Sequence, residues 1–116
     1  MVQGINDGLI DVIVSDHLPE DEESKRLPFA QAATGAIGVE TLLPLSLEMY
    51  HNESLQLNKI IETLTINPAK ILQIKKGSLT KGSDGDICIF DLEAPWAVQA
   101  DKLKSKSKNT AIEGRK

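Results

Sequence analysis

A run of branched apolar residues that ends abruptly at Asp16-His17 constrains this chain more than any other feature. Residues 9–15 are mostly Leu, Ile and Val, whereas the residues after His17 are largely charged and include Pro19. A short branched-apolar run is typical of a buried parallel strand, so we expect a strand over residues 11–15. Asp16 then lies at the carboxyl end of that strand, where a barrel enzyme keeps its chemistry.

Composition narrows the class of protein further. With 116 residues, of which 41% are hydrophobic and 26% charged, the chain is expected to be globular rather than disordered. The aromatic content of 3% is low, so the core must be aliphatic. A net charge of −4 argues against a nucleic-acid partner, because nucleic-acid binding needs a basic surface. Cys88 has no second cysteine to pair with, and its apolar surroundings predict a small buried side chain.

Nothing in the sequence predicts a membrane protein. No apolar run approaches the roughly 18 residues of a membrane span. The N-terminus lacks the basic start and apolar region of a signal peptide. We therefore expect no membrane partner and a cytoplasmic location.

Helical spacing of apolar residues predicts three helices in the middle of the chain. The first begins at Val39, or nearer Thr41 because Pro44 is tolerated only in a first turn, and ends at about His51. The second covers residues 57–64. Asn67-Pro68 has the pattern of an N-cap and first helical residue, which predicts a third, short helix through residue 72.

The residue composition differs between the segments before and after these helices. A polar loop is expected over residues 17–27, and residues 30–38 are small enough for close backbone approach to another element or to a ligand. After the turn formers of residues 77–86, strands are expected at 87–92 and 96–98, followed by an exposed loop over 102–108. Helices first and strands later predict two structural layers with a boundary near Gly77.

The polar residues leave several interpretations open when taken one at a time. Asp16 suits metal binding or proton transfer, but an aspartate at a strand end is also a common N-cap or turn former. His17 could be a ligand, orient its neighbour or face solvent. Two histidines and one cysteine, with no pair at ligand spacing, do not make a complete zinc site.

Spaced motifs follow one another along nearly the whole chain. They are Asp16-His17-x-Pro19 with Lys25, Phe29 and Ala32; Gly35-x-x-Gly38-x-Glu40-Thr41-x-x-Pro44; Leu64-Thr65-x-Asn67-Pro68-Ala69; Gly77-x-Leu79-x-x-Gly82-x-x-x-Asp86-Ile87-x-x-Phe90-Asp91; and Ser105-Lys106-Ser107-Lys108-Asn109-Thr110. In this order they resemble the C-terminal third of the dihydroorotases that belong to the amidohydrolase superfamily. The second and last motifs favour dihydroorotases over hydantoinases and allantoinases.

The resemblance implies an α/β fold, a metal-dependent hydrolase (β/α)8 barrel with a small β-sandwich built from both termini. A complete barrel takes about 250 residues, so the chain matches only its C-terminal part. Residues 1–76 would supply the last barrel strand, the substrate loop and the following helices. Residues 77–116 would supply strands of an incomplete sandwich and the C-terminal tail.

The resemblance also implies an activity, the zinc-dependent interconversion of N-carbamoyl-aspartate and dihydroorotate in pyrimidine biosynthesis. Asp16 matches the family aspartate that contacts the metal, accepts the proton of the attacking water and delivers it to the leaving nitrogen. Thr34 and Gly35 match the loop whose backbone groups bind the substrate ring.

Two departures from the family pattern qualify this expectation. Glu20 stands where the family commonly has a histidine that helps to bind the substrate carboxylate, and two carboxylates repel. The remaining zinc ligands of the family have no counterpart here, so the chain alone is expected to be inactive. The alternative is a non-catalytic dihydroorotase-like protein that supports assembly with aspartate transcarbamoylase. A homo-oligomer or that complex is the expected macromolecular partnership.

Overall fold

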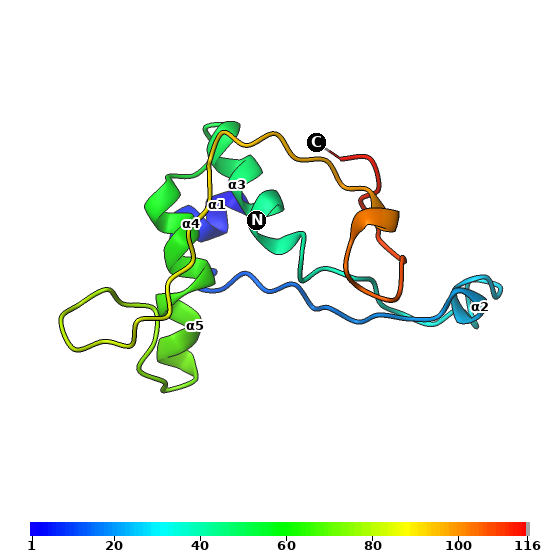
Figure 1. Ribbon diagram of the computed structural model, residues 1–116, viewed down its shortest axis with the longest axis horizontal. Coiled ribbons are helices and arrows are strands. Elements are labelled where there is room, and N and C mark those ends of the chain that lie inside the picture. Colours follow the sequence, from blue (N-terminus) through cyan, green and yellow to red (C-terminus); the bar gives the residue numbers. More distant parts are fainter. Residues whose placement is uncertain (116) are drawn as a thin grey trace. The chain divides into compact units, whose positions relative to one another are not determined.

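The computed structural model describes residues 1–115, which form two compact units (Figure 1). The first unit contains Met1–Val14 and Leu45–Glu93, and the second contains Ser15–Pro44 and the chain from Ala94 onward. The predicted boundary at Gly77 concerns the division between barrel and sandwich, so it stays a prediction. No helix of residues 1–115 combines the length and the apolar character needed to cross a membrane.

The first unit is a small helical cluster around an aliphatic core. It contains α1 (Val2–Asn6), α4 (Leu57–Leu64) and α5 (Ile66–Ile71), and α3 (Leu42–His51) enters it at Leu45. The buried residues Ile5, Leu55 and Ile60 form the centre of the core. The expectation of a core without aromatic residues is therefore confirmed for this unit, where the packed partners are Val2, Ile10, Ile13, Met49 and Leu64.

The three helices predicted for the middle of the chain are present, and the third, α5, begins earlier than expected. Residues 57–64 form α4 as predicted, and α3 begins at Leu42, which places Pro44 in the first turn. A proline costs little there, because the first four N–H groups of a helix have no intrahelical partner. The N-cap of α5 is Thr65, so the prediction of an Asn67 cap is wrong. Asn67 instead uses its amide Nδ2 to donate to the carbonyl of Asp11 at 2.9 Å.

Two short helices were not expected from the sequence. The first is α1, and the second is α2 (Glu22–Lys25), which lies inside the predicted polar loop. Asp21 is its N-cap and accepts a hydrogen bond from Ser24 N at 2.7 Å. Two glutamates in its first turn add a favourable interaction with the helix dipole.

The three predicted strands are wrong for residues 1–115, which form no strand longer than an isolated bridge. A strand exists only where a neighbouring segment completes its ladder of hydrogen bonds. Ile13 makes one backbone bond, to the carbonyl of Thr63, and the segment 87–92 is coil. Val98 exchanges two backbone bonds with residues 114 and 115 without forming a ladder. Cys88 is exposed, so the prediction of a buried thiol is also wrong.

Candidate functional site

Two segments of the second unit, residues 15–18 and 35–38, lie side by side. His17 and Ala36 form a parallel bridge, and Leu18 N donates to the carbonyl of Ala36 at 2.9 Å. A Cβ on Gly38 would lie 2.6 Å from the carbonyl oxygen of Ser15. The small residues of this stretch therefore serve a close approach of two backbones, which was one of the two uses expected from the sequence.

Gly35 is required at its position for two reasons. Its φ of +128° is rarely adopted by residues with a side chain, and a Cβ there would lie 2.8 Å from the carbonyl oxygen of Leu18. The loop that contains Thr34 and Gly35 is thereby packed directly against the segment that follows Asp16. The structure thus places Asp16 and Gly35 on two paired segments of one unit, with Thr34 directly before the second segment.

Asp16 has a left-handed backbone, with φ of 44°, and an exposed side chain. Aspartate is one of the few residues other than glycine that tolerate this conformation. Its neighbours are both held, because the Ser15 carbonyl lies against Gly38 and His17 is bridged to Ala36. Within residues 1–115 no hydrogen bond or ion pair engages the Asp16 carboxylate, which leaves it available to a ligand.

His17 has a local structural role. Its Nδ1 accepts hydrogen bonds from the backbone N–H groups of Gly38 at 3.1 Å and Val39 at 3.3 Å. An imidazole nitrogen that accepts carries no proton, so these bonds assign the proton of neutral His17 to Nε2. His17 is half-buried and holds the turn that leads toward α3, rather than facing solvent.

The substrate loop expected at Thr34 and Gly35 is anchored on both sides of one peptide group. The Nζ of Lys25 donates to the carbonyl of Ala33 at 2.6 Å and to that of Gly35 at 3.1 Å. The Nδ2 of Asn109 donates to the same Gly35 carbonyl at 2.8 Å. Between these anchors, the Thr34 C=O and the Gly35 N–H have no partner in the part of the chain described. One acceptor and one donor are therefore held ready for a ligand.

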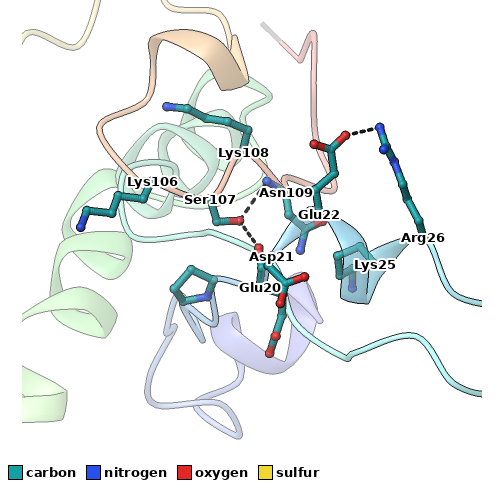
Figure 2. A pocket seen from close by; sticks show the side chains of 10 residues that line it. Glu20, Asp21, Glu22, Lys25, Arg26, Lys106, Ser107, Lys108 and Asn109 are labelled. Atoms are coloured by element: carbon teal, nitrogen blue, oxygen red, sulfur yellow. Dashed lines mark hydrogen bonds and ion pairs between the residues drawn. The ribbon is translucent and has the colours of Figure 1, made fainter.

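Residues 105–109 form a C-terminal strap, which is hydrogen-bonded both to the loop of residues 17–27 and to the small-residue stretch 30–38. Ser107 Oγ donates to the carbonyl of Glu20 at 2.7 Å, and Ile37 N donates to the backbone carbonyl of Asn109 at 2.9 Å. Figure 2 shows the Ser107 hydroxyl between the main chain of Glu20 and Asn109. The expectation of an exposed loop over residues 102–108 is wrong in part, because Leu103 is buried and Ser105 and Ser107 are half-buried.

Glu40 anchors the beginning of the strap. Its carboxylate accepts hydrogen bonds from Lys104 N at 2.9 Å and from Ser105 N at 3.2 Å. The bonds from Lys104 and then Ser105 hold the pKa of Glu40 below its usual value. The sequence motifs include Lys25 and Asn109 without indicating a role at the site, and for Glu40 they indicate a structural role, as a helix start that braces the substrate loop.

A cavity of about 670 Å³ lies between the strap and α2 (Figure 2). Three of its four cationic side chains already have partners: Arg26 pairs with Glu22, Lys25 binds the two loop carbonyls, and Lys108 Nζ donates to the Leu103 carbonyl at 2.6 Å. Glu20 lines this cavity, whereas Asp16, Thr34 and Gly35 do not. Glu20 thus lines a cavity to which the other predicted site residues do not contribute.

The residues present do not fit a zinc site by themselves. Zinc takes three or four protein ligands. Within residues 1–115 no group of three His, Cys, Asp or Glu side chains is placed to hold a metal ion. Asp16 could supply one oxygen ligand, and His17 already uses Nδ1 for backbone donors.

Comparison with known proteins decides the family. The sequence matches the amidohydrolase family over residues 1–116. The chain belongs to the amidohydrolase family. This family has a barrel-type hydrolase fold, which supports the expected fold class at the family level.

Named relatives within the amidohydrolase family narrow the resemblance. The chain is 45% identical over its whole length to a dihydroorotase of Anaplasma phagocytophilum and 43% identical to one of Ehrlichia canis. It is 42% identical over 97% of its length to a dihydroorotase of Geotalea daltonii. The chain spans about a quarter of the length of these relatives, at 26% of the first two and 27% of the third. The resemblance to dihydroorotases is therefore confirmed.

Proposed function

We propose that this chain supplies the C-terminal part of a dihydroorotase, the enzyme that interconverts dihydroorotate and N-carbamoyl-aspartate in pyrimidine biosynthesis in the cytoplasm. Relatives named dihydroorotase along the whole chain support this assignment. The observation that carries it is the anchored loop. The unpaired Thr34–Gly35 peptide lies on a segment paired with the one that carries the unpaired Asp16 carboxylate.

In this proposal Asp16 moves a proton. As water attacks the ring carbonyl of dihydroorotate, the carboxylate of Asp16 accepts a proton from that water. It then delivers the proton to the ring nitrogen as the C–N bond breaks, and ring closure follows the same path in reverse. A carboxylate without an internal partner is suited to this exchange, because no existing hydrogen bond has to be broken first.

The loop binds the ring of the substrate through its backbone. A cyclic amide presents N–H donors and C=O acceptors, and the Thr34 C=O and Gly35 N–H offer the complementary groups. Glu20 lines the neighbouring cavity, so we propose that it does not bind the substrate carboxylate. Another residue of the complete protein would then take the place of the family histidine.

Zinc enters the proposal as the metal that makes hydroxide available at neutral pH when it is bound in the complete enzyme. Asp16 would be one of its ligands. The described residues supply no further ligand set, so the chain alone would be inactive. We further propose that residues 1–76 belong to the barrel and residues 77–116 to the sandwich of that enzyme.

The test is Asp16→Asn in the complete gene product, with Asp11→Asn as the matched control. Both changes remove one exposed carboxylate from the same short segment. We expect Asp16→Asn to lower kcat by about 10²- to 10⁴-fold, the usual contribution of a general acid–base group. Asp11→Asn should retain full activity. Equal activities of the two variants would exclude the role of Asp16, and an inactive unmodified protein would exclude the enzyme.

The second candidate is a non-catalytic dihydroorotase-like protein that supports assembly with aspartate transcarbamoylase. It is favoured by Glu20, which stands in place of the usual histidine. Co-sedimentation of an inactive complete protein with aspartate transcarbamoylase would support it.

A further inference from the structure

We propose that Asn109, with Lys25, is a positioning residue that fixes the Thr34–Gly35 peptide in its ligand-binding orientation. This inference rests on the proposed function of that loop. It assigns a role to two residues that would not themselves contact the substrate.

Three hydrogen bonds converge on two carbonyl groups of this loop. Lys25 Nζ spans the carbonyls of Ala33 and Gly35, at 2.6 and 3.1 Å, and Asn109 Nδ2 reaches the Gly35 carbonyl at 2.8 Å. These carbonyls belong to the peptide groups on either side of the Thr34–Gly35 peptide. Because each peptide group is planar, fixing both neighbours restricts the rotation of the one between them.

Gly35 explains why such anchors are needed. Its φ of +128° requires a glycine, and glycine is the residue with the widest conformational freedom. Without anchors, the peptide that is proposed to meet the substrate would sample many orientations. Lys25 and Asn109 approach from sequence separations of 10 and 74 residues, so the restraint comes from tertiary structure.

The side chain of Asn109 can be removed without detaching the strap. Its backbone carbonyl still accepts from Ile37 N at 2.9 Å, and Ser107 Oγ still donates to Glu20. Asn109→Ala therefore deletes one anchor of the loop and preserves the connections around it. This separation makes a positioning role distinguishable from a general structural role.

Asn67 provides a matched control within the same chain. It also donates its Nδ2 to a distant backbone carbonyl, that of Asp11 at 2.9 Å, but in the other compact unit. Asn67→Ala should lower the melting temperature about as much as Asn109→Ala, since each deletes one amide-to-carbonyl bond. If the two variants then differ in KM, the difference comes from the Thr34–Gly35 loop and not from a general loss of stability.

The decisive measurement is the kinetics of these variants in the complete gene product. We expect Asn109→Ala and Lys25→Met each to raise KM for dihydroorotate up to about tenfold, as the loss of one or two hydrogen bonds would, with a smaller change in kcat. Asn109→Asp should be at least as impaired, because a carboxylate cannot donate to the Gly35 carbonyl. Asn67→Ala should leave KM unchanged. An unchanged KM in Asn109→Ala would overturn the proposal.

A second readout keeps the inference independent of activity. In backbone NMR of the 116-residue chain, Asn109→Ala should increase the fast motion of the Gly35 and Ala36 amides. The Ile37 amide should stay protected from exchange, because its acceptor is the main chain of residue 109. A Gly35 amide that stays as rigid as in the unmodified chain would overturn the proposal. An inactive complete protein with a mobile Gly35 in the variant would overturn only the proposed function.

Discussion

At the scale of single residues, the site depends on the absence of a Cβ atom at two glycines. Gly35 and Gly38 let residues 35–38 lie against residues 15–18, and a Cβ at either would come within 2.8 Å of backbone oxygen. The sequence predicts that small residues here permit a close approach. It does not say what approaches, because the partner segment lies some twenty residues earlier and is chosen by the tertiary structure.

Glu40 provides a residue-scale prediction about pH. Backbone N–H groups of Lys104 and Ser105 hold the pKa of Glu40 below its ordinary value of 4.5 in the folded chain. The carboxylate therefore stabilises the folded chain above pH 4.5, and this contribution is lost as the pH falls through the lowered pKa. Glu40→Gln should destabilise the chain at neutral pH, and the difference from the unmodified chain should shrink with acidification.

Urea unfolding of both chains at several pH values measures this difference. Glu62→Gln is the control, since Glu62 is exposed and its carboxylate has no partner within residues 1–115. The control should track the unmodified chain at every pH. The difference in free energy of unfolding between Glu40→Gln and the unmodified chain should not stay constant with pH. If it is constant down to the lowest pH at which the chain folds, the Glu40 carboxylate does not stabilise the chain as proposed.

At the scale of elements, helices could be predicted from the sequence and strands could not. A helix closes its hydrogen bonds within its own segment, so the spacing of Leu57, Ile60 and Leu64 predicts α4. A strand is a relation between segments, and residues 11–15 and 87–92 have no ladder partner among the described residues. Helix α2 was missed because four polar residues carry no apolar period.

Ile60 provides the element-scale prediction. It is 0% exposed at the centre of the first core, whereas Ile71 at the end of α5 is 64% exposed. Ile60→Ala should lower the free energy of unfolding by about 2–5 kcal/mol, through lost burial and the cavity left behind. Ile71→Ala makes the same chemical change and should stay within about 0.5 kcal/mol. Urea unfolding measures the free energy of unfolding of both variants. Equal decreases would show that Ile60 is not at the centre of the core.

At the scale of the whole molecule, the motifs predict the family but not the connections that organise the site. Asp16, Thr34 and Gly35 could be predicted as site residues because each matches a short sequence motif of the family. The anchoring of the loop by Asn109 joins positions 74 residues apart, so no local pattern indicates it. Ser107 joins the strap to Glu20 across 87 residues in the same way. Long-range polar contacts of this kind are known only once the chain is folded.

Metal binding supplies the whole-molecule prediction. Zinc is held in proteins by three or four N, S or O ligands, and residues 1–115 bring no three such side chains together. The 116-residue chain should therefore show no saturable zinc binding at micromolar concentrations in isothermal titration calorimetry. Asp16→Asn should give the same heats, because a single carboxylate ligand leaves the ion mostly hydrated. Stoichiometric zinc by elemental analysis, after dialysis at sub-micromolar free metal, would show that the chain assembles a ligand set of its own.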